Sequence, residues 1–258
     1  MSPRQIGRFL LVSWWLHLKF VATARLFLFT ALIIPPIFAT LGFHVAGAST
    51  QRPALLVSIG AGLMGMWSST LLSAGAIVDQ QRRHGTLEPL IASPMALPLT
   101  VVPAIVASAT SGMYSLAATL GWGVLLFDVS VTVSQPFLLV GCIVAMVLSV
   151  GGLGMLLAAA LVRYPAAAGF SNLLEYPVWI LSGMLVPIAL LPGFAQWLSA
   201  VVPPAWAVRA VYASVTGGNA AGPLLVCVAA TAAEFLVAGV LLGMTERAAR
   251  SSATAYTS

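Results

Sequence analysis

Long uninterrupted apolar segments constrain this chain more than any other feature of its sequence. Six segments reach the roughly 20 residues that an α-helix needs to cross the hydrocarbon core of a bilayer. They cover approximately residues 26–45, 54–78, 97–127, 137–162, 169–187 and 223–245. Only 7% of the 258 residues are charged, whereas a soluble domain carries roughly 25%. The sequence therefore predicts an all-α integral membrane protein, with six transmembrane helices in one domain over residues 1–258.

The basic residues set the expected orientation of these spans. If the N-terminus is cytoplasmic, only Arg52 and Arg209 of the 11 Lys and Arg residues fall outside. The others lie at cytoplasmic span ends: Arg4, Arg8, Lys19, Arg25, Arg82, Arg83, Arg163, Arg247 and Arg250. Because cytoplasmic loops are enriched in Lys and Arg, we expect a multi-pass protein of the cytoplasmic membrane with both termini in the cytoplasm. The basic residues are scattered, so no nucleic-acid partner is expected.

Residues 4–20 are expected to form a helix that lies in the headgroup region. Basic residues occupy one side of this helix, and Trp14 and Trp15 suit the membrane interface. The alternative is a secretory signal peptide with a cleavage site near residues 22–24. His17 and Lys19 shorten the apolar run that such a peptide needs.

A polar stretch, residues 79–94, separates the second and third apolar segments. Gly85 permits a turn, and the Thr86 side chain can cap a helix that follows. Glu88 then falls in the first turn, where the helix dipole favours a negative charge, and Pro94 ends the helix. Its apolar residues form one stripe: Leu87, Leu90 and Ile91. The pattern predicts a short amphipathic helix over residues 86–93 at the membrane surface.

This stretch resembles the coupling-helix loop of ABC-2 type transporter permeases. That loop combines acidic and basic residues with Gly-Thr-Leu-Glu, a Leu and Ser/Thr-Pro. The matching residues are Asp79, Arg82, Arg83, Gly85, Thr86, Leu87, Glu88, Leu90, Ser93 and Pro94. The resemblance implies that the residues from Asp79 to Leu90 in this set, together with Ile91, dock a separate ATPase subunit.

A second resemblance to the same family lies in the C-terminal third. ABC-2 permeases close the fifth span with Leu-Ser-Gly-x-x-x-Pro and continue with Leu-Pro, a short helix and a basic-plus-Gly ending. The corresponding residues are Leu181, Ser182, Gly183, Pro187, Leu191, Pro192, Pro203, Arg209, Gly217 and Gly218. Residues 188–222 are too apolar for a free loop and too rich in proline for one span. We expect short re-entrant helices in the outer leaflet, before the last span.

Prolines, glycines and cysteines predict how the spans bend and pack. Pro35 and Pro36 should kink or locally break the first span. Gly60, Gly62 and Gly65 give the second span a smooth face for close helix packing. Two cysteines, Cys142 and Cys227, fall within spans and are expected to pack as small apolar residues. These two cysteines predict neither a disulfide nor a metal site.

The sequence carries no enzyme signature. A phosphate-binding G-x-x-x-x-G-K-[ST] loop needs a Lys after Gly, and the only Lys, Lys19, follows Leu18. No catalytic residue, metal ligand or bound cofactor is predicted. The resemblance implies the permease subunit of an ATP-driven exporter, in the branch that resembles drug and antibiotic resistance. ATP and Mg would be bound by the separate ATPase. A second permease subunit, identical or paralogous, and membrane lipid are the other expected partners.

Two carboxylates inside spans, Glu175 and Glu234, are candidates for a substrate path. Compact outer loops favour an amphipathic drug-like or lipid-like cargo. Polysaccharide or glycolipid export remains an alternative. An ion-coupled secondary transporter is another, although residues 26–127 and 137–245 show no convincing repeat. A scaffold or channel subunit is the third alternative.

Overall fold

All regular elements are helices in the part of the chain that the computed structural model describes, residues 3–23, 25–47, 53–83, 85, 95–163 and 173–255. The first are α1 (Pro3–Thr23), α2 (Arg25–Gly47), α3 (Ala54–Arg83), α5 (Leu97–Ser111), α6 (Met113–Phe127) and α7 (Pro136–Arg163). They are followed by α8 (Glu175–Leu181), the 3-10 helix η2 (Ile188–Leu190), α9 (Gly193–Val201), α10 (Pro203–Thr216) and α11 (Ala221–Ala255). Helices satisfy their own backbone hydrogen bonds, as a chain in lipid requires.

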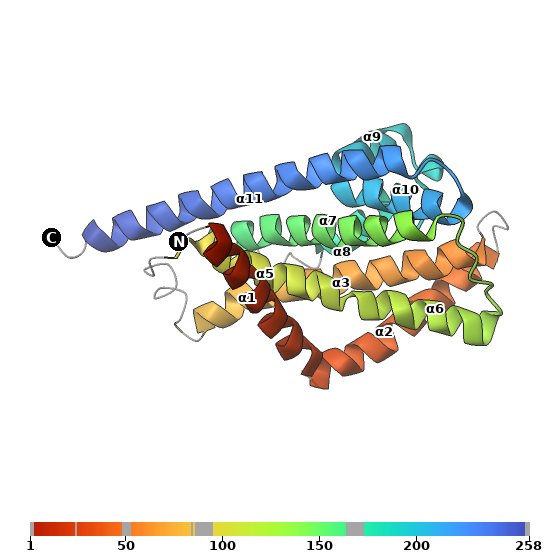
Figure 1. Cartoon of the computed structure of the whole chain (residues 1–258), viewed down its shortest axis with the longest axis horizontal. Helices are drawn as coiled ribbons and strands as arrows, with labels where there is room; N and C mark the ends of the chain where they lie inside the picture. Colours follow the sequence, from red (N-terminus) through yellow and green to blue (C-terminus); the bar gives the residue numbers. More distant parts are fainter. Residues whose placement is uncertain are drawn as a thin grey trace.

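The long helices lie side by side along the longest axis of the molecule (Figure 1). α1 crosses this bundle obliquely, and α9 and α10 gather at one end of it. Both chain termini lie at the opposite end, where α3 ends and α5 begins. The C-terminal part of α11 continues past the rest of the bundle.

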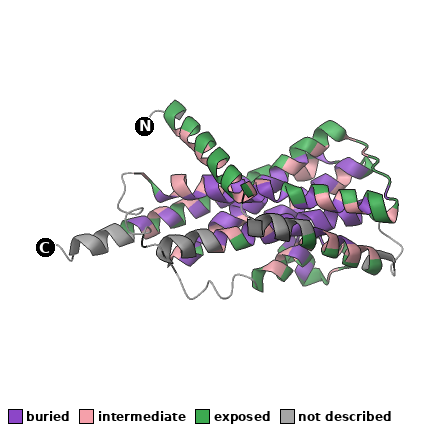
Figure 2. Ribbon diagram, turned by 90° about the horizontal axis from the view of Figure 1, so that it is seen from below, coloured by how far each residue is buried: buried purple, intermediate pink, exposed green. Residues whose placement is uncertain are grey.

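α3 is the central helix of the bundle. Trp67, Leu63 and Met66 are almost completely buried, and buried residues run through the middle of the molecule (Figure 2). α11 is the opposite case, because many of its large apolar side chains are exposed, among them Leu225 and Leu236. Exposed apolar side chains of this kind are typical of a helix on the outside of a membrane protein.

Glycines let α3 and α6 approach more closely than other residues would allow. A Cβ atom on Gly62 would lie 2.6 Å from the Cα of Leu116, and one on Gly112 would lie 2.7 Å from the Cα of Met66. Gly60 is equally tight, because a Cβ atom added there would lie 2.5 Å from the Met184 carbonyl oxygen. The predicted close-packing face of the second span is therefore confirmed.

Four segments of the described residues are long and apolar enough to cross a membrane: Ala54–Gly75, Leu97–Phe127, Pro136–Val162 and Ala221–Arg247. They correspond to the second, third, fourth and sixth predicted spans. The third is made by α5 and α6, which meet at Gly112. Gly112 keeps a right-handed helical backbone (φ −59°, ψ −15°), so the chain continues in nearly the same direction.

Of the other two predicted spans, the fifth differs from expectation. α2 covers the first span as one helix that contains Pro35 and Pro36, so the helix is not broken there. In the fifth span, α8 ends at Leu181 and does not reach Pro187. Gly183 adopts φ +82°, a left-handed conformation that glycine tolerates and that turns the chain out of the helix. The Leu-Ser-Gly sequence thus marks the end of a helix.

Residues 188–222 form short helices, as the proline pattern predicts. α9 and α10 meet at an angle of 95°, and Pro203 begins α10. The Trp206 indole donates a hydrogen bond to the Ala200 carbonyl (2.9 Å), and the Arg209 guanidinium donates one to the Ser199 hydroxyl (3.2 Å), so both residues of α10 bind α9. These contacts fix the bend between the two helices.

Candidate functional site

The end of α3 carries the charged residues of the predicted coupling segment. α3 has 30 residues, so at about 1.5 Å per residue it is about 45 Å long, against roughly 30 Å for a hydrocarbon core. α3 continues to Arg83, so Asp79, Arg82 and Arg83 belong to the last turns of this helix and not to a loop. Gly85 follows with φ +64°, the turn conformation that its position predicts.

The rest of the predicted coupling segment lies outside the described residues. This applies to Thr86, Leu87, Glu88, Leu90 and Ile91. The chain is described again from Met95, and α5 begins at Leu97. The predicted coupling helix thus stays a prediction, connecting the end of the central helix with the start of α5.

The start of α5 is held by a residue that the sequence pattern did not single out. Glu246, near the end of α11, accepts a hydrogen bond from the Leu97 backbone N–H at 2.9 Å. Both residues are buried. Ala96, which precedes α5, has no side chain that can cap the helix, so Glu246 takes that role from a distant part of the chain.

Glu175 lies in the first turn of the short helix α8, against α3. The Ser68 hydroxyl on α3 donates a hydrogen bond to its carboxylate. One turn further along α8, the Trp179 ring makes edge-on contacts with Phe38 of α2 and Tyr176, at 5.0 and 5.2 Å between ring centres. A carboxylate beside several aromatic rings suits a positively charged, partly apolar group.

Glu234 occupies a different place, on α11 facing α7. Its side chain is 8% exposed, and neither carboxylate oxygen has a hydrogen-bond partner among the described residues. A Cβ atom on Gly152 of α7 would lie 2.6 Å from Glu234 Oε2, so the glycine makes the space that the carboxylate fills. Glu175 and Glu234 are thus packed against different helices, α3 and α7.

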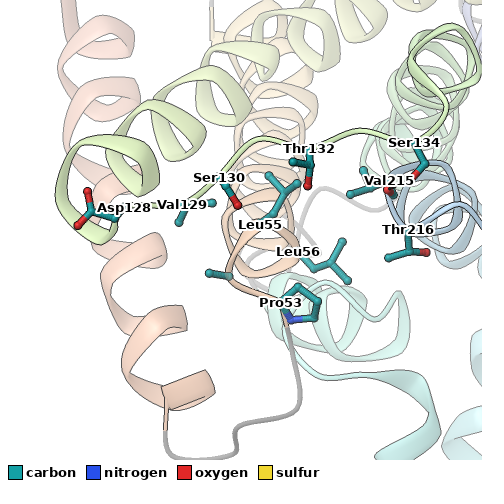
Figure 3. A pocket seen from close by; sticks show the side chains of 11 residues that line it. Pro53, Leu55, Leu56, Asp128, Val129, Ser130, Thr132, Ser134, Val215 and Thr216 are labelled. Atoms are coloured by element: carbon teal, nitrogen blue, oxygen red, sulfur yellow. Dashed lines mark hydrogen bonds between the residues drawn. The ribbon is translucent and has the colours of Figure 1, made fainter.

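A hollow of about 470 Å³ lies where the connection between α6 and α7 passes the start of α3 (Figure 3). The start of α3, the connection between α6 and α7, and the end of α10 line it. Its hydroxyl groups come from Ser130, Thr132, Ser134 and Thr216. The Val215 carbonyl accepts bonds from both the backbone N–H (3.2 Å) and the hydroxyl (2.9 Å) of Ser134, which ties the α6–α7 connection to α10.

The structure therefore separates the predicted site residues into three places. The charged end of α3 leads into the coupling segment, Glu175 lies between α8 and α3, and Glu234 lies between α11 and α7. Ser68, Gly152 and Glu246 are the contacting residues that sequence reasoning missed. Their contacts join residues far apart in the chain, and no local pattern indicates them.

Comparison with known proteins agrees with this arrangement. No curated protein matches the sequence. The model of the ABC-2 type transporter family matches residues 8–215, from α1 to the end of α10. This match covers most of the 258 residues. The chain therefore belongs to the ABC-2 type transporter family.

Proposed function

We propose that this chain is the permease subunit of an ATP-driven ABC-2 exporter, which moves an amphipathic drug-like or lipid-like substrate out across the cytoplasmic membrane. The observation that carries the proposal is the course of α3. This helix is buried along the bundle, and its charged last turns lead through Gly85 into the segment that resembles a coupling helix. A displacement of that segment would act directly on the core of the molecule.

ATP and Mg would be bound by a separate ATPase subunit that docks on residues 79–91. The apolar stripe of Leu87, Leu90 and Ile91 would enter a groove of the ATPase, and the charges of Arg82, Arg83 and Glu88 would orient it. A second permease subunit, identical or paralogous, completes the proposed exporter. Closure of two ATPases on ATP would move both coupling segments together.

The surroundings of Glu175 support a cargo with a cationic group and an apolar body. Its carboxylate is held by Ser68, and Tyr176 beside it is 61% exposed. Aromatic faces attract cations, and a carboxylate adds a charge partner. Glu234 is the second residue proposed for the substrate path, and its carboxylate is buried.

The coupling proposal is tested by placing a charge in the apolar stripe. Leu90→Asp and Glu88→Lys should lower ATP-dependent export about tenfold or more, because burial of one Leu side chain contributes about 1.5–3 kcal/mol. The chain is reconstituted in liposomes with the ABC ATPase that co-purifies with it. Export of a fluorescent lipophilic cation and of a fluorescent phospholipid analogue is measured with ATP hydrolysis.

Val131→Asp is the matched control, because it adds the same charge to an exposed apolar residue in the connection between α6 and α7, away from the end of α3. It should export as the wild type does. The proposal fails if Leu90→Asp keeps normal ATPase stimulation and export, or if the wild-type chain moves neither probe and does not change ATP hydrolysis.

Two alternatives predict other outcomes in the same liposomes. Glu234, a buried carboxylate without a hydrogen-bond partner among the described residues, favours an ion-coupled secondary transporter. Such a transporter would move the cation when a proton gradient is imposed, without ATP or an ATPase. A polysaccharide or glycolipid exporter would stimulate ATP hydrolysis while moving a lipid-linked oligosaccharide in place of the two probes.

A further inference from the structure

The first turn of α5 is capped by a side chain from a distant part of the sequence. Glu246 Oε2 lies 2.9 Å from the Leu97 backbone nitrogen. The preceding residue, Ala96, makes no side-chain cap, and Pro98 has no N–H to be satisfied. The next N–H, that of Leu99, binds the Ala96 carbonyl at 2.9 Å. Glu246 therefore provides the cap that α5 lacks locally.

The surroundings make this contact strong. Leu97 is 1% exposed and Glu246 is 9% exposed, so water competes little for either group. The amino end of a helix carries a partial positive charge, which favours a carboxylate there. A hydrogen bond to a charged acceptor is about twice as strong as one between neutral groups. Leu97 belongs to a buried apolar cluster that also contains Val101 of α5, Leu161 of α7 and Leu242 of α11.

Glu246 belongs to the one stripe of α11 that faces the protein. The buried residues of this helix recur every three or four positions: Cys227, Thr231, Glu234, Ala238, Leu242 and Glu246. Along most of its length the remaining surface of α11 is exposed or half-buried. Near its C-terminal end, α11 is thus joined to α5 by the packing of Leu242 and by the hydrogen bond of Glu246.

We propose that Glu246 is a positioning residue that makes α11 move together with the first turn of α5. The predicted coupling segment ends just before Leu97. A displacement of this segment would therefore reach the last span through Glu246, as well as the third span through the chain itself. The inference rests on the proposed function, because it assumes that an ATPase displaces residues 79–91.

The test separates the link between helices from simple capping. Glu246→Ala removes both roles. Adding Ala96→Ser to that variant gives α5 a cap of its own, since residue 96 already has the extended backbone of a capping position (φ −63°, ψ 131°). Glu246→Gln keeps an acceptor oxygen, and Arg247→Gln changes the exposed neighbouring charge as a control. Thermal unfolding and permease-dependent ATP hydrolysis are measured on the complex with the co-purified ATPase.

We expect Glu246→Ala to lose stimulation of ATP hydrolysis by about tenfold, the factor that corresponds to about 1.4 kcal/mol. The double variant should regain its unfolding temperature without regaining stimulation. Arg247→Gln should resemble the wild type, and Glu246→Gln, which keeps the acceptor but loses the charge, should lie between the wild type and Glu246→Ala. If the single variant does not fold, the double variant is compared with Ala96→Ser alone.

Two results would overturn the inference: full stimulation by Glu246→Ala, or full recovery of stimulation in the double variant, which would make Glu246 only a cap. Failure of the proposed function looks different, because the wild-type chain itself would then leave ATP hydrolysis unchanged.

Discussion

Glu234 shows how much one side chain in a span can constrain. Insertion scales assign roughly 2.5–3.5 kcal/mol to an ionised carboxylate at the centre of a membrane helix. Among the described residues Glu234 has no hydrogen-bond partner, and it lies opposite Gly152, on the buried stripe of α11. A polar partner supplied by the cargo would satisfy this carboxylate, so we keep it in the proposed substrate path.

Glu234→Gln tests this role, because glutamine keeps the shape and hydrogen-bonding capacity but cannot ionise. Export of the lipophilic cation should fall about tenfold, since a hydrogen bond to a charged group contributes about 1.5–3 kcal/mol. The amount of protein in the membrane and the stimulation of ATP hydrolysis should not change. Glutamine that exports as well as glutamate, with Glu234→Ala unfolding at lower temperature, would make the residue structural.

At the scale of elements, the close crossing of α3 and α6 depends on glycines, which have no Cβ atom. Gly62 faces the Cα of Leu116, a backbone atom that cannot rotate away. Gly62→Ala should therefore destabilise the protein by about 1–3 kcal/mol, the usual cost of overpacking. The measurement is thermal unfolding in detergent.

Gly239→Ala is the control for that experiment. Gly239 lies in α11, and a Cβ atom added there would meet nothing within 4 Å. Alanine has a higher helix propensity than glycine, so this variant should unfold at the wild-type temperature or above it. Equal loss of stability in both variants would show that the close approach at Gly62 is not what holds the two helices.

The sequence predicted a helix correctly wherever a long segment was continuously apolar. Apolar length alone located α3, α5–α6, α7 and α11, because a span must be long and continuously apolar. Prolines predicted the break between α9 and α10. The predicted end of the fifth span, at Pro187, was wrong, because α8 ends at Leu181 and Gly183 already turns the chain. Pro35 and Pro36 do not interrupt α2, which continues through both, and the kink expected there stays a prediction.

The candidate sites were less predictable than the helices. A polar residue inside an apolar segment, such as Glu175, is visible in the sequence, but its partner Ser68 lies in another helix. Glu246 sits at the end of a span, where a charged residue is ordinary, and only the buried stripe of α11 distinguishes it. Which face of the last span is buried depends on packing against α5 and α7, and the nearly uniform apolar sequence around Glu234 does not reveal that face by its periodicity.

At the scale of the whole molecule, the two chain termini and the start of α5 share one end of the bundle (Figure 1). The distribution of basic residues predicts that this end is cytoplasmic. In a chain in which Cys142 and Cys227, both buried, are replaced, single cysteines at Ser49 and Gly218 should react with an impermeant thiol reagent in intact cells. A cysteine at Gln81 should react only after permeabilisation.

The opposite labelling pattern would contradict the predicted orientation. Reaction of the Gln81 cysteine in intact cells, with protection at Ser49 and Gly218, would place the coupling segment outside and would exclude an ATPase in the cytoplasm as its partner. Gly218 is exposed just after α10, so its protection could not be explained by burial within the chain.

The narrow stripe by which α11 contacts the bundle has a consequence for the evolution of the chain. Positions such as Leu225, Leu236 and Val240 face outward and need only remain apolar, so substitutions among apolar residues should accumulate there freely. Ala238 and Leu242 are fully buried, and position 246 requires a buried side chain with an oxygen that can accept the Leu97 N–H. Among relatives, this last helix should therefore keep a recognisable residue only at every third or fourth position, and overall sequence similarity should decline there first.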